Sequence, residues 1–299
     1  MPEPPGAPAM KTLLECVPCF ARQALDAVSE AVADPARRES LLRRLLREIA
    51  AGDWSGSPPA MAQRLHRSIR RELDNPDPYR DIKIRMNQMA ASLVPAMRAR
   101  IEAHPDPREA AVRVAIGGNL LDVGAKTQIA AEDLPAHLET IWTQPLRGDL
   151  AAFFRAVARA RRILYLADNA GEIFFDRLLI ERLPAEKITV VVRGSPVLND
   201  ATIEDAEAAG LPELVPVLDN GSDAPGTILE DCSEEFRGGF DRADLVIAKG
   251  QGNYETLSDV KKNMFFLFTV KCPLVAARVG EPVGSLVAKA AQPTPEDSE

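Results

Sequence analysis

Apolar residues recur at three- and four-residue steps from Leu13 to about Arg100, in segments such as CFARQALDAVSEAV and RRESLLRRLLREIA. This spacing places them on one face of a helix, so it predicts an α-helical N-terminal region. Turn-forming stretches such as ADPA and DNPDPY separate the predicted helices. We therefore expect a helical domain over residues 11–110, with disordered ends at residues 1–10 and 291–299.

Beyond Asp149 the pattern changes to short apolar runs that alternate with helical segments. The runs RILYLAD, ITVVVRG, ELVPVLD and ADLVIAKG resemble buried strands, and segments such as AGEIFFDRLLIERL lie between them. Strands that alternate with helices form βαβ units, whose sheet is mostly parallel and covered on both faces. The sequence therefore predicts a three-layer, Rossmann-like α/β fold over residues 111–290.

Composition and charge narrow the class of protein. The chain of 299 residues is 46% hydrophobic and carries a formal net charge of −8, which opposes broad attraction to nucleic acid or anionic lipid. No apolar stretch approaches the ~20 residues that cross a bilayer, and the N-terminal residues lack a signal-peptide pattern. We expect a cytoplasmic protein that binds neither nucleic acid nor membrane, and the oligomeric state stays open.

Cysteine and histidine usage gives no clear zinc site. Four cysteines are too few for a disulfide scaffold, which indicates reduced thiols. Cys16 and Cys19 have metal or redox spacing, but no second pair supplies four zinc ligands, so we favour two half-buried thiols that open a helix. His66, His104 and His137 all precede the predicted βαβ units, which disfavours a histidine-based triad.

Polar residues follow the predicted strands, and ligands of open α/β sheets bind outside the carboxyl ends of the strands. Asp168 and Asn169 follow ILYLA, and Asp200 follows the next run. Carboxylate and amide oxygens are hard donors that suit Mg²⁺ or Mn²⁺ better than Zn²⁺. Each residue alone is more often a helix cap, but three that converge on one edge favour a metal site.

Four other polar residues near these strand ends have open roles. Glu172, in the first turn of the following helix, either orients a metal-bound water or complements the helix dipole, and the dipole is the simpler explanation. Asp176, one turn later, is either solvated or a support for the metal ligands, and we favour the solvated helix surface. Asn119 and Asp122, in GGNLLDVGA, either line the cleft or form an ordinary turn.

The segment KGQGNYETL, residues 249–257, follows a strand and precedes a helix. Gly250 and Gly252 let the backbone approach a ligand and point amide groups at an anion, although the segment fits neither the Walker nor the dinucleotide motif. Lys249 either binds a phosphate or balances the carboxylates. Lys271, beyond the apolar run MFFLFTV, either binds a phosphate or extends to solvent.

The ordered motifs LADNAGE, PVLNDAT, KGQGNYETL and FTVKCP, with GNLLDVGA upstream and ECVPCF at the start, resemble the damage-control phosphatase family. That family was long filed as a domain of unknown function and grouped with acidic residue methyltransferase one. The match runs from about Cys16 to Pro273, and the paired cysteines are similar to the archaeal and bacterial branch. The resemblance implies metal-dependent hydrolysis of phosphate monoesters of small metabolites, often damaged forms or side-products.

The resemblance and the residue pattern together assign candidate roles. The metal, Mg, Mn, Co or Ni, is expected on Asp168, Asn169 and Asp200, and the catalytic residues are expected to be Asp168, Asp200 and Lys271. The expected partner is a small phosphorylated metabolite. Its candidate binding residues are Asn119, Asp122, Glu172, Lys249, Gly250, Gln251, Gly252, Asn253 and Lys271.

Two departures from the family pattern limit what the resemblance implies. Glu255 stands where the eukaryotic branch has arginine. Phe268 replaces the arginine of the family's arginine-threonine-any-lysine motif, in which Thr269 and Lys271 are retained. The sugar-phosphate preference of that branch therefore does not carry over.

The expected chemistry is in-line attack on a phosphoryl group, with Lys271 and the glycine-loop amides offsetting its charge. Whether Asp168 only binds metal or also attacks phosphorus stays open. If water attacks, Asp200 or Glu172 is the candidate base.

Two other functions are alternatives to the phosphatase. Carboxyl methylation with S-adenosylmethionine is weakly supported, because LADNAGE has one glycine where that cofactor calls for two or three. A non-catalytic, metal-dependent protein that binds a phosphorylated metabolite is the third hypothesis.

Overall fold

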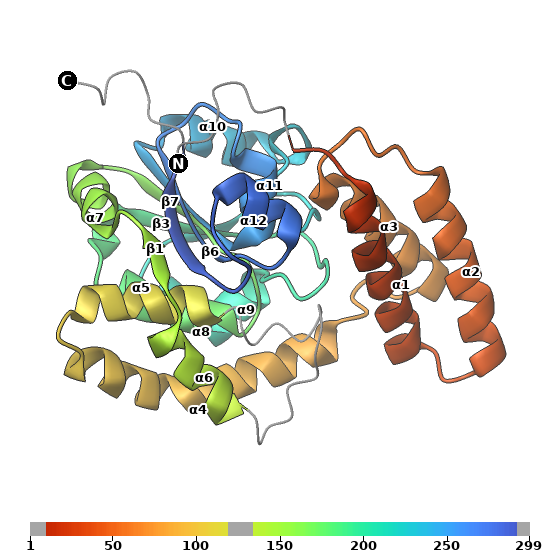
Figure 1. Ribbon diagram of the computed structural model, residues 1–299, viewed down its shortest axis with the longest axis horizontal. Helices are drawn as coiled ribbons and strands as arrows, with labels where there is room; N and C mark the ends of the chain where they lie inside the picture. Colours follow the sequence, from red (N-terminus) through yellow and green to blue (C-terminus); the bar gives the residue numbers. More distant parts are fainter. Residues whose placement is uncertain (1–9, 119–133, 292–299) are drawn as a thin grey trace.

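The structure is a computed structural model that describes residues 10–118 and 134–291 (Figure 1). Its helices are α1 Val17–Ala31, α2 Pro35–Ala51, α3 Pro58–Leu73, α4 Arg80–Ala103, α5 Pro107–Gly117, α6 Leu134–Thr143, α7 Leu150–Arg159, α8 Glu172–Ile180, α9 Ile203–Ala208, α10 Glu234–Arg242, α11 Gly250–Leu257 and α12 Pro273–Val279. Its strands are β1 Leu146–Gly148, β2 Ile163–Leu166, β3 Ile188–Val192, β4 Val217–Asp219, β5 Leu245–Lys249, β6 Met264–Thr269 and β7 Leu286–Ala290.

The strands form one 7-stranded sheet in the order β1-β7-β6-β5-β2-β3-β4. Only the β6–β7 pair is antiparallel, and the other neighbouring pairs are parallel. The central strands β2 and β5 are buried along their whole length, as covered parallel strands require. This confirms the mostly parallel α/β fold, and it brings the ends of β2, β3, β5 and β6 to one edge.

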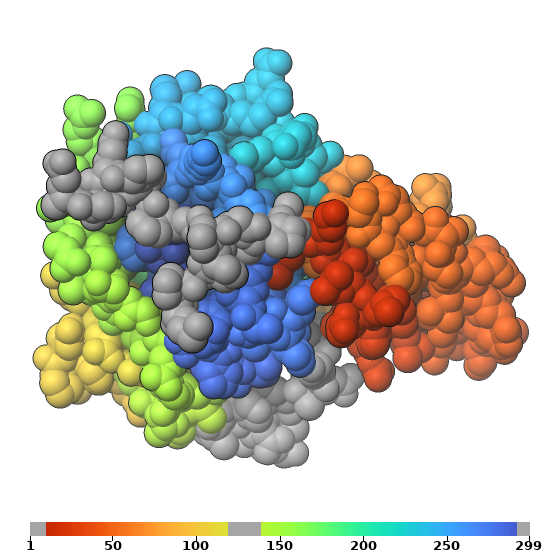
Figure 2. All heavy atoms as spheres, turned by 45° about the horizontal axis from the view of Figure 1, so that its top comes forward, coloured from red at the N-terminus to blue at the C-terminus, as the bar shows by residue number. Residues whose placement is uncertain are grey.

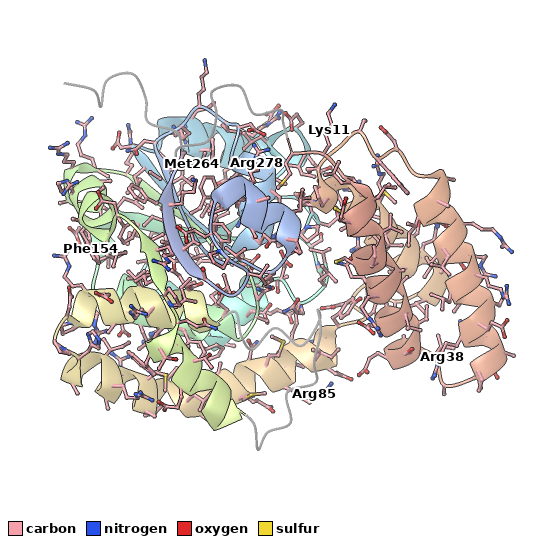
Figure 3. All side chains as sticks on the ribbon, viewed as in Figure 1. Lys11, Arg38, Arg85, Phe154, Met264 and Arg278 are labelled. Carbon is pink, nitrogen blue, oxygen red and sulfur yellow. The ribbon has the colours of Figure 1, made fainter. Side chains whose placement is uncertain are left out.

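Alternate residues of each strand join different helical layers because side chains point to opposite faces of a strand. Tyr165 and Ile247 pack in the cluster that includes α4, α5, α7 and α8. Leu166 and Val246 pack in a second cluster with α10, α11 and α12. The helices therefore cover both faces of the sheet, and side chains fill the space between the layers (Figure 3).

Helices α1, α2 and α3 form a lobe beside the sheet, drawn red to orange in Figure 1, with a core of its own that includes Phe20, Leu41 and Ile69. The long helix α4 leaves this lobe, and near that end the guanidinium of Arg85 lies 3.6 Å from Glu30 of α1 (Figure 3). Both α4 and α5 pack on α8. The expected boundary between residues 110 and 111 thus falls inside α5, which belongs to the layers around the sheet.

Residues 10 and 291, at the ends of the described chain, make backbone contacts. Met10 is buried and its amide donates to Asp259 Oδ2 at 3.2 Å, and the Ala291 amide donates to the Met264 carbonyl at 2.8 Å. The expectations for residues 1–9 and 292–299 lie outside the described residues. None of the described helices is long and apolar enough to cross a membrane.

Asp223, on the loop after β4, ties the lobe to the sheet. The orange lobe and the cyan segments of the α/β part meet in Figure 2. Its carboxylate accepts hydrogen bonds from Gln63 at 2.7 Å and from Arg67 Nε at 2.9 and 3.0 Å, and Arg70 of the same helix also donates to it. Burial favours the neutral acid, but the hydrogen bonds from Arg67 and Gln63 outweigh it and lower the pKa of Asp223.

We expect Asp223→Asn to lower the free energy of unfolding by about 1.5–3 kcal/mol at pH 7, because the charge-assisted hydrogen bonds to α3 are weakened. Since the folded pKa of Asp223 is depressed, this stabilisation is present above the unfolded pKa of about 3.9 and is lost as the pH falls through the folded value. Urea unfolding at pH 7 and near pH 3 measures both differences, and the difference is expected to shrink at the lower pH.

The control for this experiment is Asp219→Asn, which changes an exposed carboxylate at the end of β4. It is expected to alter stability by less than about 0.5 kcal/mol. An Asp223→Asn difference that stays the same at both pH values would contradict the assignment.

Candidate active site

The loops after β2 and β3 bring the three predicted metal ligands together. An isolated antiparallel bridge pairs Asn169 with Asp200, and the Ala201 amide donates to the Asp168 carbonyl at 2.8 Å. Asp168, Asn169 and Asp200 are all buried. The sequence expectation depended on parallel strands ending at one edge, and this edge holds all three side chains.

Arg193 lies between the two aspartates and was not among the residues expected from the sequence. Its Nε donates to Asp200 Oδ2 at 2.7 Å, and its Nη2 lies 3.7 Å from Asp168 Oδ1. The residue is only 3% exposed, and Nη2 has no hydrogen-bond partner among the described residues. The sequence signal for Arg193 is its position directly after the apolar strand β3, because an arginine that is buried there needs acidic partners.

Gly250 lets α11 begin against the Asp168 carboxylate. Its φ is +78°, and a Cβ at this position would lie 2.0 Å from Asp168 Oδ2. The close backbone approach expected at this glycine is therefore to a carboxylate of the site. Asn253, one turn later, is fully buried. Its side-chain Nδ2 donates to the Lys249 carbonyl at 2.7 Å, and its Oδ1 accepts from the Thr227 hydroxyl at 2.8 Å.

Lys249 is fully buried and surrounded by protein acceptors. Its ammonium donates to Glu172 Oε1 at 2.5 Å, Asp176 Oδ1 at 2.6 Å and the Ala115 carbonyl at 2.9 Å. A lysine has three N–H donors, so these bonds use all of them. Of the two roles left open for Lys249, the geometry favours balancing the carboxylates.

The expectation that Asp176 lies on a solvated helix surface is wrong. Asp176 is 1% exposed, and besides Lys249 it accepts a hydrogen bond from the Tyr165 hydroxyl at 2.7 Å. The reason is tertiary, since its partners lie on β2 and at the end of β5 and the sheet therefore covers the face of α8 that carries Asp176. The sequence of α8 does not by itself specify that cover.

The cluster of Lys249, Glu172 and Asp176 favours the neutral form of its acids, and a hydrogen bond connects it to the candidate metal site. Burial raises the pKa of both Glu172 and Asp176, against the opposing charge of Lys249. Burial lowers the pKa of Lys249, but the charges of Asp176 and Glu172 outweigh it and the net shift is upward. Asn169 Nδ2 donates to Glu172 Oε2 at 3.0 Å and to Asp168 Oδ2 at 2.7 Å, which links the two sets of acids.

Residues of the N-terminal helices hold both ligand-bearing loops. Asn87 of α4 accepts from the Gly171 amide at 2.7 Å and donates to Asp205 at 2.8 Å. Leu198 packs on the core of the α1–α3 lobe with a φ of +47°, a conformation that is uncommon outside glycine. Because Leu198 lies two residues before Asp200, the lobe contributes to the placement of that ligand.

Lys271 and the paired cysteines lie at the edge of this region. The Lys271 amide donates to Gln251 Oε1 at 3.0 Å.

Cys16 is half-buried at the start of α1, and Cys19 is exposed. Burial, and then the charges of Glu255 and Cys272, raise the pKa of Cys16, which places its thiol near α11. Within the described residues, no three His, Cys, Asp or Glu side chains are arranged to hold a metal ion.

Two expected site residues and a hollow beside α3 add nothing to this arrangement. Asn119 and Asp122 lie outside the described residues. A hollow of about 470 Å³ lies between α3 and the loop after β3, where Arg70, Ser195 and Asp223 are among its lining residues. Asp168 and Asp200 do not line it.

The model of one protein family, described as the damage-control phosphatase ARMT1-like domain, matches residues 12–287. The chain belongs to this family. Membership confirms the resemblance read from the motifs, and relatives named damage-control phosphatase support a phosphatase, hence a hydrolase, role.

Relatives of the family align over most of the chain. A damage-control phosphatase of Archaeoglobus fulgidus is 38% identical over 249 residues, covering 81% of this chain and 86% of its own. A damage-control phosphatase of Pyrococcus horikoshii is 35% identical over 286 residues, covering 93% of this chain and 97% of its own. The crystal structure of a DUF89 family protein from Pyrococcus horikoshii has a TM-score of 0.85 at 32% identity, covering 95% of this chain and 100% of that chain.

In this member of the family, we expect Lys249→Met to lower the free energy of unfolding by about 3–5 kcal/mol, because two buried carboxylates lose their counter-charge. Lys271→Met, which changes a half-buried lysine, is expected to leave stability nearly unchanged and to weaken phosphatase activity. Urea unfolding and phosphate release measure the two effects. A Lys249→Met protein with normal stability and a raised KM would show instead that Lys249 binds substrate.

Gly250→Ala is expected to reduce phosphatase activity about a hundredfold, because the added methyl group displaces the Asp168 carboxylate. Gly280→Ala is the matched control: its φ is also +78°, but no heavy atom lies within 4 Å of the added Cβ. Both changes carry the same backbone cost of about 1–2 kcal/mol, and Gly250→Ala adds the cost of displacing the buried Asp168 carboxylate, so its stability should fall further. Equal activities of the two variants would refute the importance of this contact.

Proposed function

We propose that this family member is a metal-dependent phosphatase that hydrolyses phosphate monoesters of small metabolites. In this proposal a divalent metal, Mg, Mn, Co or Ni, is held by Asp168, Asn169 and Asp200. The observation that carries it is the convergence of two buried carboxylates on one guanidinium at the carboxyl edge of the sheet, with the Asn169 amide donating to one of these carboxylates.

The donor set fits such a metal. Carboxylate and amide oxygens are the hard ligands preferred by Mg²⁺ and Mn²⁺, and the set contains no thiolate or imidazole. When bound, the metal would polarise a phosphoryl oxygen and offset its negative charge. Asp168 contacts Nη2 of Arg193 and Asp200 contacts Nε, so both carboxylates lie within reach of one side chain.

The cations around the site suit a phosphoryl group. Arg193 Nη2, beside Asp168, is a buried donor that has no hydrogen-bond partner in the part of the chain that the structure describes, and a phosphate oxygen is an acceptor that would satisfy it. Lys271 and the amides at the start of α11 would offset charge on the other phosphoryl oxygens. The protein residues then orient the ester for in-line attack, either by water or by the Asp168 carboxylate.

The alternative functions receive less support. No observation in the described residues favours S-adenosylmethionine, and the single glycine of LADNAGE argues against its close approach. A non-catalytic metabolite-binding protein would use the same ligands without turnover. The experiment below separates it from the phosphatase.

We expect removal of divalent metal with EDTA, Asp168→Asn and Asp200→Asn each to lower phosphate release about a thousandfold or more, because each removes charge stabilisation worth several kcal/mol. The measurement is phosphate release from a panel of phosphomonoesters after each metal is restored. Asp219→Asn, at the exposed end of β4, serves as the control and should remain active.

Calorimetric titration with Mn²⁺ provides a second readout, in which Asp168→Asn and Asp200→Asn should weaken binding. Activity that survives chelation and both substitutions would overturn the proposed function. Metal binding without phosphate release from any ester would favour the non-catalytic alternative.

A further inference from the structure

Glu255 is held at the rim of the site by a relay of two hydrogen bonds. It lies on α11 one turn after Gln251, whose Nε2 donates to Glu255 Oε1 at 2.9 Å. Gln251 Oε1 in turn accepts from the Lys271 amide at 3.0 Å. The start of α11 meets the Asp168 carboxylate through Gly250. The Glu255 carboxyl group is thereby tied to two strand ends that bear predicted catalytic residues.

The surroundings of Glu255 keep its proton available near neutral pH. Burial raises its pKa to about 7, against the hydrogen bond from Gln251 and the charge of Lys271, and the Asp168 charge adds a smaller upward effect. The thiol of Cys16, at the start of α1, interacts electrostatically with Glu255, and the thiol of Cys272 accepts from Gln251 Nε2 at 3.6 Å.

The other carboxyl groups near the site are already committed to cations. Asp200 accepts from Arg193 at 2.7 Å, and Glu172 accepts from Lys249 at 2.5 Å. Asp200 and Glu172 are closed off from water, whereas the Glu255 residue keeps partial solvent exposure although the surrounding protein desolvates its carboxyl group. Within the described chain, its carboxyl group receives a hydrogen bond only from the neutral amide of Gln251. Of these three acids, Glu255 is best placed to give up a proton.

Hydrolysis of an alkyl phosphate calls for such an acid, since the departing alkoxide is strongly basic. We propose that Glu255 is a catalytic residue, the general acid that protonates the leaving-group oxygen, and this rests on the proposed phosphatase function. As the P–O ester bond breaks, its electron pair passes to the ester oxygen, which takes the Glu255 proton and leaves as an alcohol. One water is consumed overall: its oxygen ends in the phosphate, and a proton that it releases restores Glu255.

The decisive experiment varies the leaving group in the metal-loaded, full-length protein. In Glu255→Gln, kcat/KM for an alkyl phosphate such as glycerol phosphate is expected to fall by about 10²–10⁴-fold. For p-nitrophenyl phosphate the loss is expected to stay below about tenfold, because nitrophenolate leaves without a proton. Glu235→Gln, an exposed change in the first turn of α10, is the matched control and should leave both rates unchanged.

The pH profile gives a readout that a structural role would not move. With the alkyl ester, the wild-type rate should decline above about pH 7 as Glu255 loses its proton, and this decline should be absent in Glu255→Gln. The wild-type profile alone tests the proposal if the variant does not fold. The decline should be clear with the alkyl ester and weak with the aryl ester.

Each outcome decides one of the two proposals. Equal losses on both esters, or none, would overturn the general-acid role of Glu255 while leaving the phosphatase in place. A wild-type protein that releases no phosphate from either ester with any of the four metals would overturn the proposed function, and the general-acid role with it.

Discussion

The need to compensate buried negative charge organises the centre of this protein. Asp168, Glu172, Asp176 and Asp200 are all nearly inaccessible to water, and desolvating each ion costs several kcal/mol. Two cations divide the four acids into pairs. Arg193 contacts Asp168 and Asp200, and Lys249 holds Glu172 and Asp176. Asn169 donates to one acid of each pair and so connects them.

The two pairs differ in what they leave available. The three donors of Lys249 are all used by protein acceptors, so this pair is closed in the sense that it offers no N–H to a ligand, and it stabilises the end of β5 against α8. Arg193 keeps a buried N–H without a hydrogen-bond partner among the described residues, so the other pair is open to an additional acceptor. A closed charged cluster behind an open one is a suitable support for a phosphoryl-transfer site, because it fixes Asn169 without competing for the substrate.

The N-terminal helices belong to the same functional unit as the sheet. The family match spans residues 12–287 and so includes them. Asn87 holds the Gly171 amide, Leu198 reaches the core of the α1–α3 lobe, and Asp223 ties that lobe to the loop after β4. Cys16 at the start of α1 lies near Glu255 of α11. The lobe therefore both positions the ligand loops and borders the rim of the site.

The sequence by itself determined the alternating α/β architecture and the meeting of Asp168, Asn169 and Asp200. Periodicity reveals which segments are strands, and parallel strands must end at one edge. The partners of the charges depend instead on how the layers pack. Asp176 is shielded from water because Tyr165 of β2 and Lys249 of β5 face it, and the roles of Arg193 and Lys249 depend on which acids face them. Local periodicity carries no information about such contacts, because they join residues that are distant along the chain.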